Sequence, residues 1–245
     1  MDDLSQSLGY KYFEETKFQR ATIHFKKRPM IEPADSWKEY PEAPKFSLPK
    51  INVKEVESDL WQILQKRRSL RKFSEKKMKP TDLSLLLWAS QGITAQAGNF
   101  LLRTAPSAGA LYPIETYLSV QNVDGIPAGL YHFHIREFQL EQLSAKLLGK
   151  EVAESALDQN FIVEAGVTFI WSAVFRRNMS KYGHRGMRYI CLDAGHICQN
   201  LLLAAEALGL ATCPVAAFYD DELNNLFGLD SNEENVLYLA AVGCK

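Results

Sequence analysis

The chain of 245 residues is long enough for one large domain or two small ones, and its 47% hydrophobic residues can fill a packed core. A formal net charge of −1 argues against a nucleic-acid partner or an anionic membrane surface. The acidic N-terminus predicts no signal peptide, and polar residues interrupt every long apolar segment, so we expect a cytoplasmic protein without a transmembrane helix.

Residues 1–50 are predicted to form an N-terminal arm, and residues 51–245 the body. Aromatic residues are too frequent in the arm for a disordered tail. We expect a short helix near the start, followed by an irregular segment that packs on the body or on a partner subunit. The irregularity is predicted from recurring prolines: Pro29, Pro33, Pro41, Pro44 and Pro49.

A basic stretch, residues 66–73, follows a predicted helix over residues 56–67. In an extended segment, alternation would place Arg67, Ser69 and Arg71 on one side. Guanidinium groups present paired donors that match a phosphate, and the hydroxyl adds a neutral donor. The alternative is a solvated basic turn whose cations complement the dipole of the preceding helix.

The next predicted helix begins at Pro80, with Thr81 or Asp82 as its cap, and ends at Gly92. Its inward face is expected to carry Leu83, Leu86, Leu87 and Ser90. The segment 94–102 is polar and contains glycine, which predicts a loop.

Small residues dominate the stretch 103–113, which precedes a predicted strand over 114–120. Such residues let a planar ring approach the backbone, where exposed amides can bond ring heteroatoms. The alternative is a plain loop before a strand.

Segments 129–135 and 138–143 have the signature of a β-hairpin. His132 and His134 share a face at strand spacing, so a metal pair is conceivable. No third ligand is near in sequence, which favours surface or partner-contact histidines and no metal site.

The later segments mix helices and strands, which indicates an α+β fold. A mostly apolar strand over 166–174 is expected at the sheet centre. The longest helix, 185–208, is apolar on much of its circumference, which predicts burial inside the domain or between subunits. The other expected elements are helices around 144–149, 151–159 and 220–227, a strand or loop over 211–218, and a last strand over 235–243.

Four cysteines, none of them in a Cys-x-x-Cys pair, lie in apolar settings and are expected to be buried free thiols of a reducing compartment. They are Cys191, Cys198, Cys213 and Cys244.

Four motifs occur in an order that resembles the flavin-dependent nitroreductase superfamily, specifically its SagB-type dehydrogenase branch. They are residues 67–73, 106–113, 181–189 and 192–200, within a match over about 56–243. The resemblance implies a nitroreductase-like fold, with a central, mostly antiparallel sheet flanked by helices. It also implies an intertwined homodimer with FMN bound at the subunit interface.

The resemblance also assigns residues to the cofactor. The FMN phosphate is expected on Arg67, Arg68, Ser69 and Arg71. The partner subunit would approach the flavin with Pro106, Ser107, Ala108 and Gly109. The ring edge near N5 would face Pro214, Val215 and Ala216. The family has a lysine or arginine after the last strand, and here only Lys245 is available for that contact.

The implied activity is two-electron hydride transfer through flavin N5 by a ping-pong mechanism. The substrate would be a nitro or quinone compound reduced with NAD(P)H, or a small molecule or peptide that is oxidised. Lys181 and Tyr182 match the lysine–tyrosine pair of azoline dehydrogenases, in which the lysine would remove a proton. Alternatively, both residues only order a loop before the long helix.

Asp193 and His196 are expected to pack the helix or form interface hydrogen bonds. Two other functions stay open. One is a flavin-binding accessory subunit of a peptide-modifying complex without turnover of its own. The other is a cofactor-free interaction domain.

Overall fold

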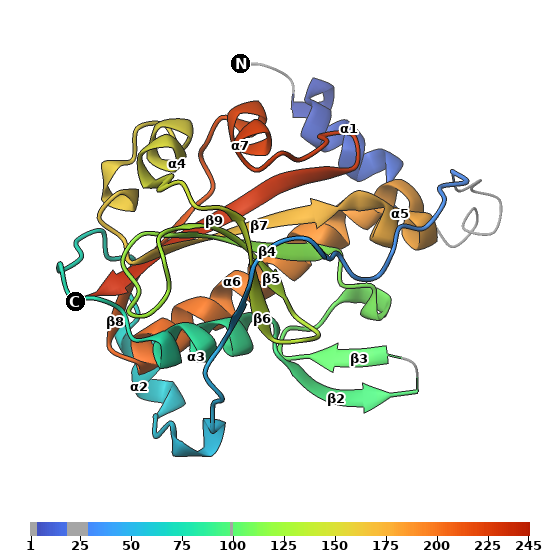
Figure 1. Ribbon diagram of the computed structural model, residues 1–245. Helices are drawn as coiled ribbons and strands as arrows, with labels where there is room; N and C mark the ends of the chain where they lie inside the picture. Colours follow the sequence, from blue (N-terminus) through green and yellow to red (C-terminus); the bar gives the residue numbers. More distant parts are fainter. Residues whose placement is uncertain (1–3, 19–28, 99) are drawn as a thin grey trace.

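A seven-stranded, fully antiparallel sheet forms the centre of the computed structural model, which describes residues 4–18, 29–98 and 100–245 (Figure 1). The strand order is β1-β6-β5-β4-β7-β9-β8. This arrangement confirms the predicted α+β class. The strands are β1 (Lys45–Ser47), β4 (Ile114–Val120), β5 (Gly129–His134), β6 (Gln139–Ser144), β7 (Val167–Val174), β8 (Leu210–Val215) and β9 (Glu234–Cys244).

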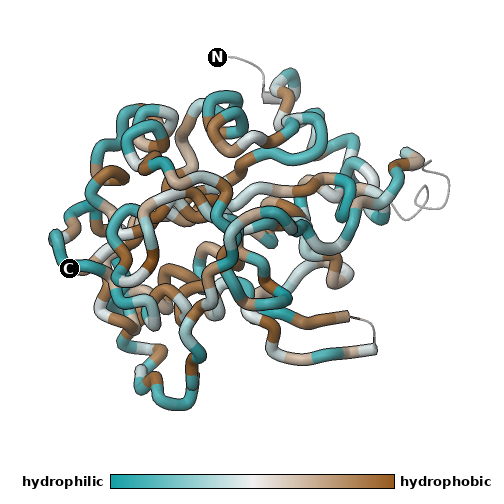
Figure 2. The backbone as a smooth tube through the Cα atoms, in the orientation of Figure 1, coloured by the Kyte–Doolittle hydropathy of each residue, from teal (hydrophilic) through white to brown (hydrophobic). Residues whose placement is uncertain are grey.

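Helices cover both faces of the sheet and enclose two apolar cores. One core packs the sheet against α3 (Pro80–Gln91) and α6 (Gly186–Ala207), and the other packs it against α4 (Gly149–Ser155) and α7 (Asp220–Leu226). Figure 2 shows brown, hydrophobic stretches along the central strands and inner helices, with teal segments at the periphery. Burial of apolar area on both faces is the main favourable term in folding.

The two helices that were predicted from the spacing of apolar residues are present in the structure. Helix α3 buries Leu83, Leu86, Leu87 and Ser90 completely, and α6 is the longest helix, at 22 residues. The predicted cap of α3 was wrong: Lys79 occupies that position, without a side-chain hydrogen bond. Pro80 is the first helical residue, and it has no N–H that needs a capping acceptor.

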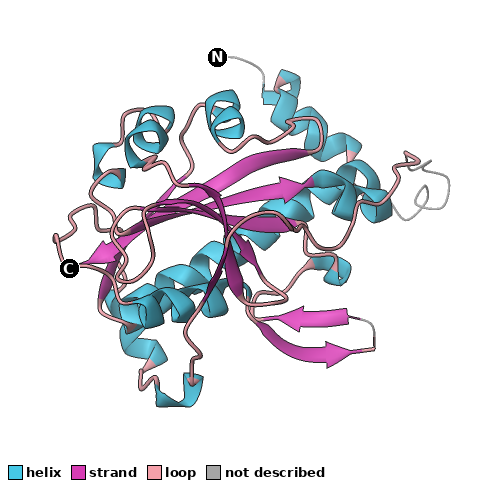
Figure 3. Cartoon of the chain, in the orientation of Figure 1, coloured by secondary structure: helices cyan, strands magenta, loops and turns pink. Residues whose placement is uncertain are grey.

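Three local predictions were wrong. The expected loop at 94–102 forms a hairpin of β2 (Ile93–Ala97) and β3 (Phe100–Arg103), which extends away from the sheet in Figure 3. Almost all of β2 is exposed, so no alternation of apolar residues marks it as a strand. The expected helix at 144–149 is absent, because β6 continues to Ser144 and α4 begins only at Gly149.

The third is the loop before the long helix, which was assumed in the alternative role of Lys181 and Tyr182. The residues there form helix α5 (Phe175–Tyr182) and a 3₁₀ turn, η5 (Gly183–Arg185). The predicted helix over 56–67 is shorter, with a 3₁₀ turn η2 (Val53–Glu55) before α2 (Leu60–Lys66). Two further 3₁₀ turns are η3 (Ala108–Ala110) and η4 (Asn160–Ile162).

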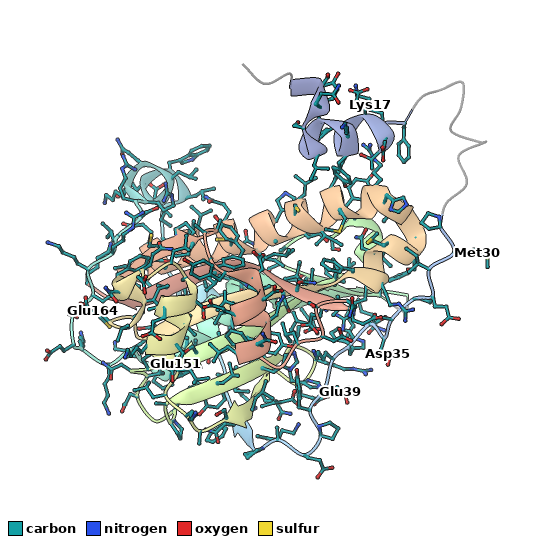
Figure 4. The ribbon with its side chains drawn as sticks, turned by 90° about the horizontal axis from the view of Figure 1, so that it is seen from above. Lys17, Met30, Asp35, Glu39, Glu151 and Glu164 are labelled. Atoms are coloured by element: carbon teal, nitrogen blue, oxygen red, sulfur yellow. The ribbon has the colours of Figure 1, made fainter. Side chains whose placement is uncertain are left out.

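The N-terminal segment begins with η1 (Leu4–Gln6) and α1 (Leu8–Glu15), which lies against α6. Arg188 of α6 donates to the Phe13 carbonyl at 2.6 Å, and its guanidinium lies 4.0 Å from the Phe13 ring centre. Farther along, Figure 4 shows Asp35 and Glu39 on a strand-free stretch at the rim of the body. No helix in the described part of the chain has the length and apolarity to cross a bilayer.

The four cysteines are free thiols, but they are not all buried. Cys198 and Cys213 are buried, whereas Cys191 is exposed and Cys244 is half-buried. The prediction was therefore wrong for Cys191, which lies on the outer side of α6. Burial raises the pKa of Cys198 to about 12, which disfavours the reactive thiolate at neutral pH.

Candidate active site

The basic stretch leaves α2 as an extended segment beside the edge strand β8. The Leu70 amide donates to the Thr212 carbonyl of β8, and the Ser74 amide donates to the Cys244 carbonyl of β9, each at 2.9 Å. Two main-chain hydrogen bonds therefore hold the segment against the sheet, which leaves its side chains available for other contacts.

Most cations of this segment remain open to solvent. Arg71 and Ser69 are exposed, and Arg67 is half-buried. Within the described part of the chain, none of the arginines at 67, 68 and 71 forms an ion pair with a carboxylate. Arg68 instead donates to the Gln65 and Arg67 carbonyls, at 3.0 and 2.7 Å, and so caps α2.

The other residues predicted near this segment lie at the same sheet edge. Pro214 and Val215 end β8, two and three residues after Thr212, and exposed Ala216 follows. Lys245 lies just beyond the pair of Leu210 with Cys244, where its amine pairs with Glu206 at 3.2 Å. The Arg71 charge opposes the effect of burial on Cys213, whose pKa is nevertheless raised.

The small-residue loop at 106–112 is tied to the long helix through Asp193. Ser107 donates its hydroxyl to Asp193 at 2.5 Å and accepts the Tyr112 amide at 2.9 Å. Burial raises the pKa of Asp193, while the bonds from Ser107 and the Ala108 amide and the nearby His196 oppose that rise. Asp193 thus orders the loop.

Lys181 and Tyr182 lie at the end of α5 and meet the loop at Gly109. A Cβ placed on Gly109 would lie 2.5 Å from the Tyr182 hydroxyl and 2.8 Å from the Lys181 amine. Gly109 also has φ +67°, a conformation that favours glycine. The fold therefore holds an amine and a phenol beside a nearly bare stretch of main chain.

The candidate residues thus form two groups within one chain. The phosphate-binding residues are Arg67, Arg68, Ser69 and Arg71 of the basic segment, the end of β8 and Lys245. The proton-transfer residues are Lys181 and Tyr182, together with Ser107 and Gly109 of the loop that they meet. Helices α2 and α5 lie at opposite sides of the body in both Figure 1 and Figure 4. The chain brings together the members of each group, but it does not bring the two groups together.

Sequence reasoning missed a buried ionic cluster next to the proton-transfer residues. His132 lies between Glu141, at 2.8 Å, and Glu115, at 3.1 Å, and Glu115 also accepts from Arg177 at 2.5 Å. His132 and His134 are buried, so the prediction that they lie at the surface was wrong. The described residues contain no cluster of potential metal ligands. A glutamate as the one charged residue of the strand over 114–120 was the available signal.

The electrostatics of this cluster follow from its pairing. Burial disfavours the charge of Glu115, but Arg177, His132 and Arg103 outweigh it and lower the pKa to about 2. The pKa of Glu141 is likewise about 2, because His132, Lys45 and the Tyr40 amide overcome burial. Burial also opposes protonation of His132, yet the two carboxylates raise its pKa.

The family model described as the nitroreductase family matches residues 64–244. Two relatives bear the name "putative nitroreductase". The one from Methanocaldococcus jannaschii is 36% identical over 196 residues, which cover 80% of this chain and 96% of that protein. The crystal structure from Anabaena variabilis has a TM-score of 0.77 and 27% identity, and covers 97% of this chain.

A third relative, the trifolitoxin-processing protein TfxB of Rhizobium leguminosarum bv. trifolii, is 37% identical over 118 residues. That alignment covers 46% of this chain and 32% of TfxB, and the Anabaena alignment covers 46% of that chain. Each of these two alignments therefore covers less than half the length of the relative. The Anabaena structure confirms the predicted nitroreductase-like fold, and the family model matches most of the sequence. The chain belongs to the nitroreductase family.

Proposed function

We propose that the chain is an FMN-dependent oxidoreductase that works as a homodimer. Two-electron transfer would pass through flavin N5 by a ping-pong mechanism, as in a SagB-type dehydrogenase or an NAD(P)H-dependent nitro or quinone reductase. The observation that carries the proposal is the separation, within one chain, of the phosphate-binding residues from the proton-transfer residues. A two-fold axis would bring the phosphate-binding residues of each subunit next to the proton-transfer residues of its partner, giving two equal sites.

The residues fit FMN. Arg67, Ser69 and Arg71 offer guanidinium and hydroxyl donors free of carboxylate partners in the described chain, as a phosphomonoester requires. Arg68 and Lys245 would add positive charge at the same edge. Gly109 and its neighbours Pro106 and Ala108 present little side chain, so a flat ring can approach the backbone. Bound FMN would supply the hydride chemistry.

The protein's own part in the reaction would be proton handling and orientation. The Lys181 amine, next to the Tyr182 hydroxyl at Gly109, would remove a substrate proton. Asp193 would keep the 106–112 loop in place through Ser107. Pro214, Val215 and Ala216 would line the ring edge near N5. The likeness to the trifolitoxin-processing protein supports a peptide or a small molecule as substrate.

The remaining assignments are part of the same proposal. Residues 1–50 would serve as an arm on the FMN-binding body, residues 51–245. Four free cysteines suit a reducing compartment, which supports a cytoplasmic location.

Three measurements test the proposal. The purified protein should be yellow, sediment as a dimer and lose its flavin absorbance on stopped-flow mixing with NAD(P)H or an azoline substrate. A colourless protein that takes up no added FMN would refute it and would favour a cofactor-free interaction domain.

A second candidate is a flavin-binding accessory subunit of a peptide-modifying complex. The likeness to the trifolitoxin-processing protein supports it. It predicts a yellow dimer whose flavin is not reduced by any of these donors alone, and is reduced only when partner proteins are added.

A further inference from the structure

Arg177 is a buried arginine that joins four parts of the molecule. It lies in α5, one turn before Lys181, and its side chain is only 4% exposed. Its Nη1 donates to Glu115 of β4 at 2.5 Å and to the Tyr112 carbonyl at 3.4 Å, and its Nε donates to the Asp35 carbonyl at 2.5 Å. A planar guanidinium with several fixed donors suits such a junction, because it can bond in three directions at once.

The anchor of Arg177 is itself fixed. Glu115 accepts from Arg177 with one oxygen and pairs with His132 with the other. His132 in turn pairs with Glu141, which also binds Lys45 and the Tyr40 amide. The carboxylates therefore cannot turn away from their cations without leaving buried charge unpaired, which is costly.

The bond to Tyr112 connects this anchor to the loop that faces Lys181 and Tyr182. Tyr112 is held at its carbonyl by Arg177 and at its amide by Ser107, which is bound to Asp193. Gly109 lies in the chain between Ser107 and Tyr112, the two held residues of the loop. Arg177 therefore holds both sides of the contact, the helix that carries the amine and phenol and the loop that they meet.

The same arginine connects the arm to this contact. Asp35, which accepts from Arg177 and is labelled in Figure 4, is followed by Trp37, whose ring lies 5.0 Å from the Arg103 guanidinium and 5.8 Å from that of Arg136. Residues 35–45 thus cover the cluster. Displacing this stretch would remove one of the attachments of Arg177.

We propose that Arg177, anchored by Glu115, is a positioning residue that sets the placement of Lys181 and Tyr182 against the Gly109 loop and couples that placement to the arm. The reaction that this placement serves is the oxidation proposed above. The coupling is mechanical: one guanidinium connects β4, the loop, the arm and α5.

The test compares Arg177→Gln, Arg177→Lys, Glu115→Gln and the double variant Glu115→Gln/Arg177→Gln. Arg176→Gln is the matched control, since Arg176 is the neighbouring arginine of α5 and pairs with exposed Glu233 at 3.3 Å. Each variant is made as the full chain labelled with 3-fluorotyrosine. The ¹⁹F signal of Tyr182 is assigned from Tyr182→Phe.

The geometry predicts a displaced or broadened Tyr182 signal in Arg177→Gln and an unchanged signal in Arg176→Gln. Arg177→Lys should restore it only in part, because an ammonium lacks the planar fork. The double variant should recover folding stability, since both charges are removed, without recovering the signal. An unchanged Tyr182 signal in folded Arg177→Gln or in the folded double variant would overturn the proposal.

Turnover provides the second measurement, with a synthetic thiazoline peptide as probe. Arg177→Gln should lose about 10- to 100-fold in kcat, as expected for a misplaced reacting group, with FMN content and KM changed less than about twofold. An equal kcat for Arg177→Gln and wild type would also overturn the proposal. A wild-type protein without bound FMN or turnover refutes the oxidoreductase function instead, and the Tyr182 signal still decides the role of Arg177.

Discussion

The two ends of the molecule treat charge in opposite ways. At the β4–β5–β6 end, Glu115, His132, Glu141 and Arg177 are buried, and each one is paired. At the β8 edge, Arg71 is exposed, and the segment that carries it is held by main-chain hydrogen bonds. Paired buried charge fixes a structure, whereas exposed cations without carboxylate partners suit an anionic ligand. The same residue types thus serve positioning at one end and, we propose, binding at the other.

The largest expected effect separates chemistry from cofactor binding. Lys181→Ala should lower azoline oxidation by about 10²–10⁴-fold, because a positioned general base contributes roughly that factor. FMN absorbance should stay at the wild-type level, since Lys181 is not one of the phosphate-binding residues. Steady-state kinetics and the visible spectrum check both points. Retained turnover would exclude the base role of Lys181 and leave it a structural one.

The next effect concerns stability at the buried end. Glu141→Ala should lower the free energy of unfolding by about 3–5 kcal/mol, because His132 and Lys45 lose their shared carboxylate. Urea denaturation measures the change. The control is Glu154→Ala, which removes an exposed pair with Lys150 and should cost less than about 0.5 kcal/mol. Equal effects in the two variants would contradict the contrast between the ends.

The pH dependence of stability should reveal the same cluster. The pKa values of Glu115 and Glu141 fall from 4.5 to about 2 on folding, so their contribution is complete above about pH 4.5 and is lost as pH falls toward 2. The pKa of His132 is raised above 6.5, so its contribution is complete below 6.5 and is lost as pH rises through the higher folded value. Thermal unfolding from pH 2 to 9 should show both slopes, and His132→Gln should remove the alkaline one. A flat wild-type profile would contradict the assigned pairing.

The smallest effect is expected at the exposed end. Arg71→Ala should weaken FMN binding by about tenfold, the order expected for one hydrogen bond to a charged group, and leave the free energy of unfolding unchanged. Fluorescence titration with FMN and urea denaturation supply the two numbers. Lys72→Ala, the neighbouring exposed cation, is the matched control and should bind FMN as wild type does. A loss of stability in Arg71→Ala would show that this arginine is structural.

Periodic burial made much of the fold predictable. Leu83, Leu86 and Leu87 repeat at helical spacing and are all fully buried, and the strand at 114–120 was marked by alternating residues. The hairpin β2–β3 was not predictable, because its exposed residues pack on no core. Helix α5 was missed because its buried residues, Arg177 and Asn178, are polar. No hydrophobic pattern therefore predicts a helix there.

The candidate site was only partly readable. Motif order pointed to Arg67, Ser107 and Lys181, but it carried no information on which of them lie near one another. The contact of Lys181 and Tyr182 with Gly109 depends on how α5 packs against the loop. The ion pair of Arg177 with Glu115 joins residues far apart in the chain, so only the folded structure reveals it.

The flanks of the seven-stranded sheet restrict how the protein can associate. On one side β8 is shielded by the segment that hydrogen-bonds to Thr212 through Leu70. On the other side β1 has only three residues and is bracketed by Pro44 and Pro49, which donate no amide hydrogen. Neither border offers a long free row of peptide groups to a foreign strand. Self-assembly by strand addition is thereby discouraged, which leaves helices and side chains as the surfaces for any contact between subunits.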